Sequence, residues 1–452
     1  MYRGYVMIMN KINRALLMNI LLAILCLAFV CMYGCEFTIK DGKNNTELQS
    51  AGDSEDNDLG GVENEVQDGN SVTITFVGDI TMHKRQIEKY YTGDGSFDIS
   101  KGLEYVSSYL EDSDYTVGNL ETTLAGPGNG PHMDAMGYSG FPNFNSPDDL
   151  AYTLKDAGFD MLQTANNHCM DTGLSGLMRT IDILDDAGLK HVGTSRDQNE
   201  CDSRCIVDIG GIKFGFVAYT SEINSNSYVE GKPYLFNSLH SYDEMYVSEL
   251  YDRVEQFRSD GVDIVIALMH WGNEYEEIPD DKQRSLAKGL FEHGVDVIVG
   301  GHPHEAQPVE CQVVGNGQGQ KRKCYVFYSL GDFLSDAVYD DDGVNKDIGL
   351  IAKVTFAKRE STDGKSCEVT DVSLIPTHIY ENENTVGVVA VPDALEKRES
   401  GDNIYDFLSD KDWERIEYAQ KNINLEIQYK ACVHYDRRGR PESFQEASGC
   451  GS

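Results

Sequence analysis

The sequence predicts an α/β protein, and two observations carry this prediction. From Val72 onward, short β-rich runs alternate with amphipathic stretches, which is the pattern of strands and helices that pack in layers. Side chains able to bind metals, among them aspartate, asparagine and histidine, follow several of the β-rich runs directly. Because ligands of open α/β sheets bind beyond the carboxyl ends of the strands, the alternation also predicts where a site lies.

The apolar periodicity gives the elements in chain order. Buried strands are predicted where β-branched and aromatic residues cluster, at Val72–Val77, Tyr115–Leu120, Phe159–Thr164, Val262–Met269 and Val295–Val299. Stretches with helical spacing predict helices over Leu103–Leu110, Asp148–Ala157, Leu174–Ala187, Tyr242–Arg258 and Asp281–Glu292. Residues Cys205–Tyr219 are expected to form a hairpin that turns at Gly210-Gly211.

Beyond residue 340 the pattern is less regular. Strands are expected near Gly349–Phe356 and Val369–Ile375, and a final helix near Asp402–Lys421, before a tail that contains cysteine. We therefore take residues 72–340 as the main domain. Residues 341–452 are expected to complete this domain or to be appended to it.

The charge of the chain excludes one broad class of function. Asp and Glu number 75 against 38 Lys and Arg, which gives a formal net charge of −37. A field of that sign repels phosphate backbones, so the chain is not expected to bind nucleic acid. Cationic partners or bound metal ions fit this charge better.

The N-terminus predicts attachment to a membrane. Lys11 and Arg14 precede an apolar run, Ala15–Gly34, in which Asn19 is the clearly polar residue. A helix of about 20 apolar residues spans a bilayer, and the same run fits a signal sequence with a long apolar region. The basic flank orients the N-terminus toward the cytoplasm. Residues 1–35 are therefore predicted to be a membrane anchor or signal segment, with a single span that precedes an extracytoplasmic domain.

Cys35 offers an alternative mode of attachment. It follows Gly34 as in a lipoprotein cleavage site, although Met32 and Tyr33 depart from the small residues of that pattern. We favour an uncleaved anchor and keep a lipoprotein attached through Cys35 as the alternative. Residues 36–71 are acidic and contain few apolar side chains, which predicts a flexible tether.

Two cysteines predict a disulfide in an oxidising compartment. Cys311 and Cys324 flank a turn-rich insert between two strand-like runs, so a bridge across this hairpin is expected. The cysteines of the exported part form no CxxC pair, which argues against a zinc site built from thiolates.

The strongest functional signal lies at the strand ends. The residues that end or follow successive strands are Asp79, Asn119 and Glu121, Asn166-Asn167-His168, His270 and Glu274, and His302 and His304. Taken singly, such an aspartate is often a helix cap, an asparagine often a turn residue, and a histidine often part of the core. Together they supply carboxylate, amide and imidazole groups, which suit divalent zinc, manganese or iron.

These residues belong to longer motifs: Phe76–Ile80 (FVGDI), Gly118–Leu124 (GNLETTL), Ala165–Gly173 (ANNHCMDTG), His270–Tyr275 (HWGNEY), Val297–Glu310 (VIVGGHPHEAQPVE) and Tyr328–Phe333 (YSLGDF). In this order, through residues 72–340, they resemble the CapA-type bacterial capsule-synthesis proteins (PGA_cap), which are associated with poly-γ-glutamate synthesis. The resemblance implies a fold like that of the calcineurin-like metallophosphatases. This fold is a sandwich of two mixed β-sheets flanked by helices, with a metal centre at the strand ends.

The resemblance also implies roles for individual residues. The implied metal ligands are Asp79, Glu121, Asn167, His270, His302 and His304, with Glu121 as a bridging carboxylate. The implied cofactor is one or two divalent ions, manganese, zinc or iron. His168 is implied as the acid that protonates a leaving group. The residues expected around the ligands are Asn119, Asn166, Glu274 and Asp332.

The sequence departs from the family pattern at a few positions. The metallophosphatase pattern has a histidine two residues after the first aspartate, where this chain has Thr81, with His83 two residues further on. This departure leaves one metal position with fewer ligands and allows a single-metal or weakly dinuclear site. Asp332 stands where asparagine is expected, and Gly301 where histidine or asparagine is common.

The implied function is that of an exported, membrane-anchored, metal-dependent hydrolase in capsule or poly-γ-glutamate synthesis. Its substrate would be a cell-surface polymer or its precursor, and its partners the membrane, the polymer and components of the synthase. The alternative is a non-catalytic metal-binding partner of a membrane polymer synthase or export complex. A metal-stabilised structural domain is a third reading. The net charge of −37 repels a polyanion, so polymer binding would need bound metals or a local basic patch.

Overall fold

The computed structural model describes residues 71–224, 231–315, 321–336, 343–361, 364–423 and 428–430. The chain divides into two units, Met1–Asn64 and Glu65–Ser452, and the described residues all belong to the second. The predicted anchor and tether therefore lie outside the described residues. Within those ranges, no helix is long and apolar enough to cross a membrane.

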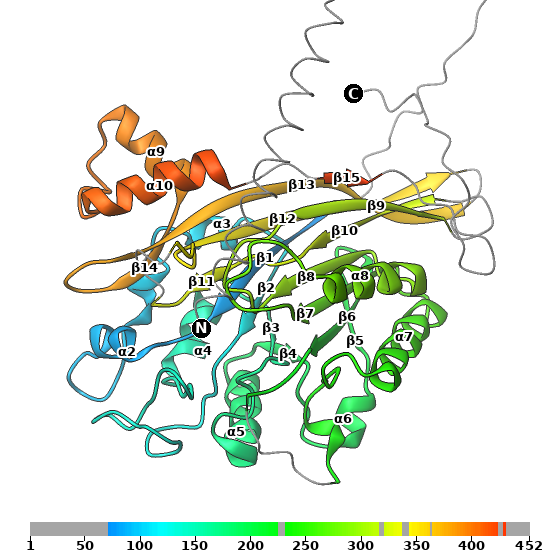
Figure 1. The fold of residues 1–452 in the computed structure, drawn as a ribbon, viewed down its shortest axis with the longest axis horizontal. Helices are drawn as coiled ribbons and strands as arrows, with labels where there is room; N and C mark the ends of the chain where they lie inside the picture. The colour runs from blue at the N-terminus through cyan, green and yellow to red at the C-terminus, as the bar shows by residue number, and fades with distance from the viewer. Residues whose placement is uncertain are drawn as a thin grey trace, which may run out of the picture. The chain divides into compact units, whose positions relative to one another are not determined.

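The described strands form two mixed sheets (Figure 1). The order in the first sheet is β14 (Val386–Ala390), β13 (Gly364–Glu381), β12 (Ile348–Ser361), β1 (Ser71–Ile80), β2 (Tyr115–Leu120), β3 (Met161–Gln163) and β4 (Lys190–Val192), with β11 (Asp332–Leu334) paired to β1. The order in the second is β15 (Gln428–Lys430), β9 (Val309–Gly315), β10 (Lys321–Phe327), β8 (Val297–Gly301), β7 (Ile264–His270), β6 (Ile212–Thr220) and β5 (Cys205–Ile209). The predicted α/β class is confirmed.

Helices flank the sheets. The longer ones are α4 (Asp149–Asp156), α5 (Gly173–Asp186), α7 (Glu244–Ser259), α8 (Asp281–His293), α9 (Val391–Ser400) and α10 (Asp410–Asn422). The shorter ones are α2 (Lys84–Tyr90), α3 (Ser107–Glu111), α6 (Gln198–Asp202) and the 3₁₀ turns η1 (Ile99–Gly102) and η2 (Pro233–Leu235). Leu250 of α7 and Leu290 of α8 pack on the second sheet, and Leu150 of α4 packs on the first.

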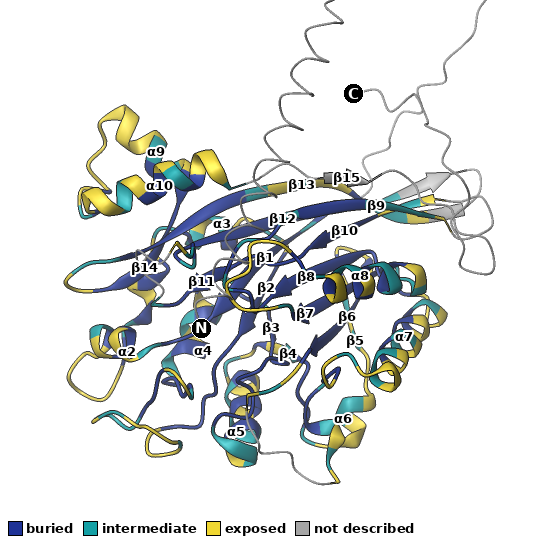
Figure 2. Ribbon diagram, in the orientation of Figure 1, coloured by how far each residue is buried: buried dark blue, intermediate teal, exposed yellow. Residues whose placement is uncertain are grey.

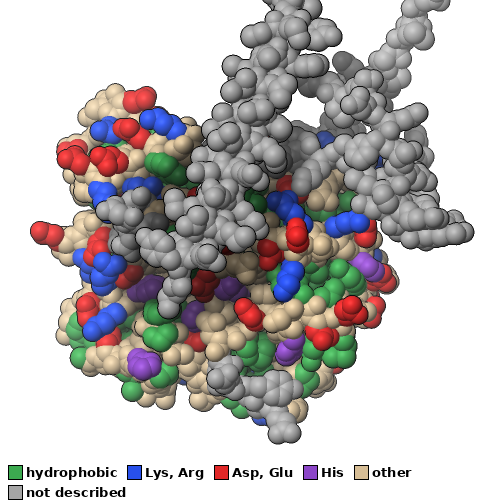
Figure 3. Space-filling model, in the orientation of Figure 1, with side chains coloured by type: hydrophobic (Ala, Val, Ile, Leu, Met, Phe, Trp, Pro, Cys, Tyr) green, Lys and Arg blue, Asp and Glu red, His purple; other side chains and the backbone are tan. Residues whose placement is uncertain are grey.

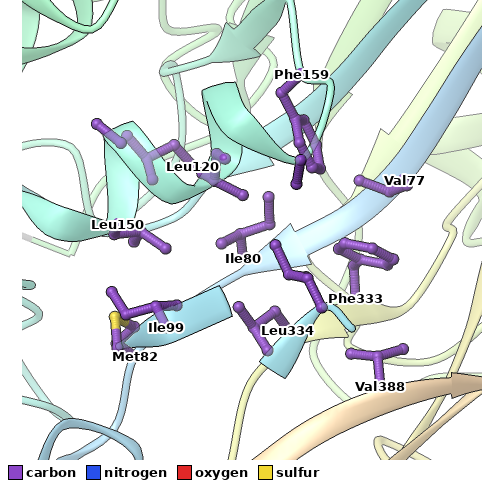
Figure 4. Close-up of a cluster of buried hydrophobic side chains, with 14 of the residues drawn as sticks. Val77, Ile80, Met82, Ile99, Leu120, Leu150, Phe159, Phe333, Leu334 and Val388 are labelled. Atoms are coloured by element: carbon purple, nitrogen blue, oxygen red, sulfur yellow. The ribbon is translucent and has the colours of Figure 1, made fainter. Parts of the chain in front are cut away.

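The largest apolar interface lies between the sheets. Phe76 of β1 and Val117 of β2 face Phe216 of β6 and Leu268 of β7, and all four are buried. Figure 2 shows both sheets as mostly buried ribbon. On the other face of the first sheet, Ile80 and nearby side chains of β2, β11 and α4 form a second cluster (Figure 4). Burying each such side chain contributes about 1.5–3 kcal/mol, so β1 is held firmly on both faces.

The sequence beyond residue 340 supplies central strands of the first sheet. β12 pairs antiparallel with β1 from Ser71↔Ala357 to Val77↔Ile351. β11, which precedes residue 340, pairs parallel with the end of β1 at Asp79↔Asp332. On its other side β1 pairs parallel with β2. Strands from distant parts of the chain therefore fix the position of Asp79.

The final helix predicted over residues 402–421 is present as α10, but it begins at Asp410 instead of Asp402. A separate helix before it, α9, was not predicted, and both helices cover β13. Gly401 ends α9 in the left-handed conformation, and Ser409 caps the start of α10 with Asp412 in a capping box. The helix predicted over residues 103–110 is likewise shortened to α3, and the 3₁₀ turn η1 precedes the predicted range.

The predicted disulfide is also wrong, because Cys311 and Cys324 are free thiols. The hairpin exists, but its register pairs Cys311 with Tyr325 and Cys324 with Gln312. A shift of one residue sends side chains to opposite faces of a sheet. Cys311 accordingly packs between the two sheets, whereas Cys324 packs on the face that carries α7 and α8.

Candidate metal centre

The carboxyl ends of strands from both sheets meet at one site. Asp79 lies near the end of β1, Glu121 directly follows β2, and Asn167 lies in the loop after β3. From the second sheet, His270 ends β7, and the loop after β8 carries His302 and His304. In Figure 3, histidine and acidic side chains gather near the middle of the visible face. The structure thus brings the predicted ligands of both sheets together.

Glu121 is shared by two sets of possible metal ligands. One set is Glu121, His270 and His302, and the other is Asp79, Glu121 and His304. The ligand atoms within each set lie within 4.8 Å of one another. A carboxylate common to both sets has the position that a bridging ligand requires.

The carboxylate of Glu121 is also the best test of whether these residues fit a metal. It is fully buried, and neither of its oxygens has a hydrogen-bond partner among the described residues. The Nδ1 atom of His302 and the Nδ2 atom of Asn167 are buried and unpartnered as well. Buried polar atoms are rarely left unpaired, since this costs about 1–3 kcal/mol each. Divalent cations would satisfy the carboxylate and the imidazole, so the residues present fit them.

Asp79 is held by two donors. Asn119 Nδ2 donates to its Oδ1 over 2.7 Å, and the backbone N–H of His302 donates to its Oδ2 over 2.9 Å. Gly301 lies against the same carboxylate, because a Cβ there would stand 2.3 Å from Asp79 Oδ1. This close approach explains why glycine occupies the position where the family pattern often has a larger residue.

His270 lies between Asn119 and Asn167. Its Nδ1 faces Asn119 Nδ2 at 3.2 Å, and its Nε2 lies 2.8 Å from Asn167 Oδ1 and 3.3 Å from Glu121 Oε1. Because the Asn119 amide donates to Nδ1, the ring proton resides on Nε2 in the metal-free protein. Burial lowers the pKa of His270 to about 3, so the imidazole is neutral, as a ligand must be.

His302 and His304 both adopt positive φ angles, 96° and 58°. Such conformations are uncommon for residues other than glycine and accumulate at functional sites. Asp332 Oδ1 lies 2.7 Å from His304 Nδ1, and its Oδ2 accepts a hydrogen bond from Ser335. Burial opposes the charged form of His304, but Asp332 and Glu121 outweigh it and hold its pKa well above the usual range.

The carboxylates of this site are crowded. Burial raises the pKa of Glu121 to about 7, and burial together with Glu121 raises the pKa of Asp79 to about 6. Two buried acids this close favour protonation of one of them unless a positive charge lies between them. Cations bound here would reverse both shifts.

His168 lies beside the ligand sets and is buried. Its Nδ1 is 2.7 Å from Asp171 Oδ2, and its Nε2 is 3.2 Å from Asn224 Nδ2. Burial lowers the pKa of His168, but the hydrogen bond and charge of Asp171 outweigh it, so the pKa is raised. Phe144 packs edge-on against the ring at 4.6 Å between centroids. These contacts fix the orientation of the imidazole.

Asn166 and Glu274 are the remaining residues that were predicted to surround the ligands. Asn166 donates to Asn119 Oδ1 and to the Leu120 carbonyl, so it supports the ligands indirectly. Glu274 is exposed and lines a pocket of about 160 Å³ beside the site, together with His168, His304 and Asp332. The orienting role of Asp171 was not predicted, although its spacing three residues after His168 indicates it.

Thr81 and His83 do not join the ligand sets. The Oγ1 atom of Thr81 is buried without a partner among the residues described. His83 lines the same pocket and packs against Phe144 at 4.9 Å between ring centroids, and burial lowers its pKa. In the set that contains Asp79, the imidazole comes from His304 instead.

Comparisons with known proteins agree with the predicted family. Residues 73–337 match the model of the family described as bacterial capsule synthesis protein PGA_cap. The chain is 28% identical over 276 residues to the capsule biosynthesis protein CapA of Bacillus anthracis, which covers 60% of this chain and 61% of that protein. It is 29% identical over 271 residues to the PGA biosynthesis protein CapA of Bacillus subtilis, which covers 59% of this chain and 63% of that protein. The match thus spans about three fifths of these relatives.

A solved phosphatase from Mycoplasma pneumoniae covers 68% of this chain and 94% of its own length, with a TM-score of 0.38 and 13% identity. This similarity is too low to support a conclusion about fold or activity. The family match is different in kind, because it spans 265 of the 452 residues (337 − 73 + 1) and contains every residue of the two ligand sets. The chain therefore belongs to the bacterial capsule synthesis protein PGA_cap family, as its motifs predicted.

Proposed function

We propose that the chain is a metal-dependent hydrolase of the phosphoesterase type that acts in the synthesis of a cell-surface polymer. The observation that carries this proposal is the sharing of Glu121 between two ligand sets, which suits a pair of divalent ions. The capsule and poly-γ-glutamate roles named for the relatives support the place of this activity in polymer synthesis. Manganese, zinc and iron suit the mixture of oxygen and nitrogen ligands.

In such a reaction, different residues of the chain would bind the ions, position the ligands and donate a proton. Asp79, Glu121, His270, His302 and His304 would hold the ions, and Asn167 Oδ1 faces the same space as a further ligand. Bound divalent ions supply a water of lowered pKa and polarise the ester oxygen. Asn119 and Asp332 hold Asp79, His270 and His304 in place. His168, oriented by Asp171, would donate a proton to the leaving oxygen.

The cellular setting is part of the proposal. The apolar run over residues 15–34 would anchor the chain in the cell membrane, and the domain described here would act outside the cytoplasm. There it would meet the polymer, its precursors and the synthase components. The rival proposal is a metal-binding partner of the synthase that has no turnover, and the absence of a histidine at Thr81 favours it.

Two substitutions separate these functions. The full chain would be purified, loaded with manganese or zinc and tested for metal content and for hydrolysis of phosphate esters and γ-glutamyl peptides. His302→Ala should lower the metal content, because it removes an imidazole without replacement. His168→Ala should keep the metal and lose hydrolysis by roughly 10²–10⁴-fold. His293→Ala, which alters a half-exposed histidine paired with Glu255, serves as the matched control.

The results of these measurements distinguish the hydrolase from the non-catalytic partner. Metal binding without hydrolysis of any ester or peptide, together with normal polymer production by His168→Ala cells, would support the rival partner. Wild-type protein that holds no divalent metal after loading would falsify the site.

A further inference from the structure

Two exposed aromatic side chains line the pocket beside the metal centre. Phe141 is 75% exposed and Tyr275 is 49% exposed, although both are large hydrophobic residues. The same pocket of about 160 Å³ is lined by His168 and His304, so the aromatic rings border the space in front of the proposed acid and a proposed ligand. Single exposed aromatics are common on protein surfaces, but two that border one polar pocket are a feature of binding sites.

The loop that carries Phe141 is tied at both ends. Ser139 and Asn145 exchange both backbone hydrogen bonds, at 3.1 and 2.8 Å. The side chain of Asn145 accepts from the Ala125 N–H at 2.9 Å and donates to the Gly126 carbonyl at 3.0 Å. Phe141 is therefore presented to solvent by an anchored turn, and its exposure does not result from a loosely held chain.

The same turn is attached to the proposed proton donor. The backbone N–H of Phe144 donates to Asp171 Oδ2 over 2.6 Å, and this oxygen also faces His168 Nδ1. In addition, the Phe144 ring packs edge-on against the rings of both His83 and His168. Phe141 is thus fixed relative to the catalytic side of the pocket.

Tyr275 is fixed beside the metal ligand His304. It adopts a positive φ of 66°, and its backbone N–H donates to the Pro303 carbonyl over 2.7 Å. Its ring lies 6.0 Å from the ring of His304, and Lys346 Nζ lies 5.8 Å from the Tyr275 ring centroid. A strained backbone that holds an exposed ring beside a ligand points to a functional requirement.

We propose that Phe141 and Tyr275 form a subsite that binds a flat-faced ring in the alcohol part of a phosphate ester, such as a sugar or a nucleoside. This inference rests on the proposed function, because it assigns a substrate class to that site. Stacking of an exposed aromatic side chain on the apolar face of another ring removes both faces from water and lowers the free energy of binding. Lys346, which also lines the pocket, would supply positive charge near the phosphoryl group, whereas the charge of Arg85 is paired with Asp336 and Glu381.

The size of the pocket agrees with binding at its rim. Pockets that enclose a drug-sized ligand have volumes of about 300–1,000 Å³, so the space of about 160 Å³ bordered by the described residues accepts a phosphoryl group rather than a whole substrate. The attached ring would then lie outside this space, where Phe141 and Tyr275 are exposed. An open-chain ester has no flat face to offer them and would lose this interaction.

The test is a comparison of matched esters. The full-length, metal-loaded His168→Ala protein is titrated calorimetrically with glucose 1-phosphate, adenosine 5′-monophosphate and glycerol 2-phosphate, so that binding is measured without turnover. We expect at least one ring-bearing ester to bind more tightly than glycerol 2-phosphate. Adding Phe141→Ala should weaken that ester about tenfold and leave glycerol 2-phosphate unchanged, whereas Phe141→Tyr should restore the affinity.

Met133→Ala serves as the control, because Met133 is also exposed but does not line the pocket. The two ring-bearing esters identify whether the ring is that of a sugar or a nucleoside. Equal affinities for all three esters, or an equal loss for all of them in Phe141→Ala, would overturn the subsite. Wild-type protein that holds metal and hydrolyses the three esters equally well would reject the subsite while the proposed function stands. Absence of metal would reject the proposed function itself.

Discussion

Asn167 Oδ1 lies 2.8 Å from His270 Nε2, and this contact joins the two sheets at the centre of the site. Asn167 follows β3 of the first sheet, whereas His270 ends β7 of the second. The same Nε2 atom lies 3.3 Å from Glu121 Oε1. One nitrogen therefore faces an amide oxygen and a carboxylate oxygen, and a cation bound at this nitrogen would contact all three groups at once.

Glu121→Gln should remove more metal than His302→Ala does. Glu121 belongs to both ligand sets, whereas His302 belongs to one, so the first substitution weakens two positions and the second weakens one. The measurement is the number of metal ions per chain after loading and gel filtration, determined by elemental analysis. A Glu121→Gln protein with the wild-type metal content would contradict the shared role of this carboxylate.

The same substitution should stabilise the metal-free protein. Wild-type Glu121 is a buried carboxylate whose oxygens have no hydrogen-bond partner among the described residues, and burial raises its pKa to about 7. Glutamine carries no charge to desolvate, so Glu121→Gln should raise the free energy of unfolding by about 1–3 kcal/mol in chelator. Denaturant unfolding of both proteins in chelator checks this. A lower stability for the variant would show that the carboxylate has a partner that glutamine cannot replace.

Asp171→Asn should impair hydrolysis according to the leaving group. Asp171 orients His168, whose proposed task is to protonate the leaving oxygen. A nitrophenolate leaves without a proton, whereas an alkoxide needs one. The variant should therefore lose roughly 10²-fold or more on an alkyl phosphate and much less on p-nitrophenyl phosphate. Metal content should stay at the wild-type level, and an equal loss on both substrates would contradict the assignment.

The strand ends could be predicted because each depends on local sequence. Apolar runs bounded by polar residues locate β1, β2 and β7, and parallel strands deliver their final residues to one edge. The ends of the last two helices also carry local signals, Gly401 after α9 and the Ser409–Asp412 pair at the start of α10, but the predicted helix began at Asp402 and missed both.

Other features depend on pairing between distant segments. Asp332 reaches His304 because β11 pairs with β1, and no local pattern encodes this register. The positions of Cys311 and Cys324 on opposite faces follow from a one-residue offset in the hairpin, which their spacing does not reveal. The exposed position of Phe141 at the pocket likewise follows from the anchoring of its loop, which no strand or helix pattern predicts.

Membrane attachment can be tested directly. Residues 15–34 are apolar and preceded by Lys11 and Arg14, so the rest of the chain is expected outside the cytoplasm. Protease added to intact, wall-stripped cells should release a soluble fragment that contains the described domain. Replacing Lys11 and Arg14 with glutamate should reduce its export. Full protection of the C-terminal region from protease would contradict this topology.

A buried ionic network anchors the C-terminal helices. Arg415 of α10 donates two hydrogen bonds of 2.8 Å to Asp347 and one of 2.9 Å to Asn345, which flank the pocket residue Lys346. Arg415→Leu leaves the buried Asp347 without this partner and should cost about 3–5 kcal/mol of unfolding free energy. The control is Arg398→Leu, which breaks an exposed pair with Glu417 and should cost about 0–1 kcal/mol. Similar losses for the two variants would contradict the anchoring role.

The same network should give stability a defined pH dependence through His378. Burial opposes the charged form of His378, but the carboxylates of Asp347 and Asp412, 3.2 and 3.0 Å from its ring nitrogens, outweigh it and raise its pKa. The contribution of His378 to the free energy of unfolding is therefore complete below its unfolded pKa of about 6.5. It is lost as pH rises through the folded pKa.

Burial also opposes ionisation of Asp347 and Asp412, but the contacts of both with His378, and the hydrogen bonds from Arg415 to Asp347, outweigh it and lower both pKa values. Their contribution is present above about pH 3.9 and is lost as pH falls through the folded values. The difference in unfolding free energy between wild type and His378→Gln should thus be largest between about pH 4 and 6.5 and should shrink above this range. Denaturant unfolding across this series measures it, and a difference that stays constant as pH rises would show that His378 is not charged in the folded protein.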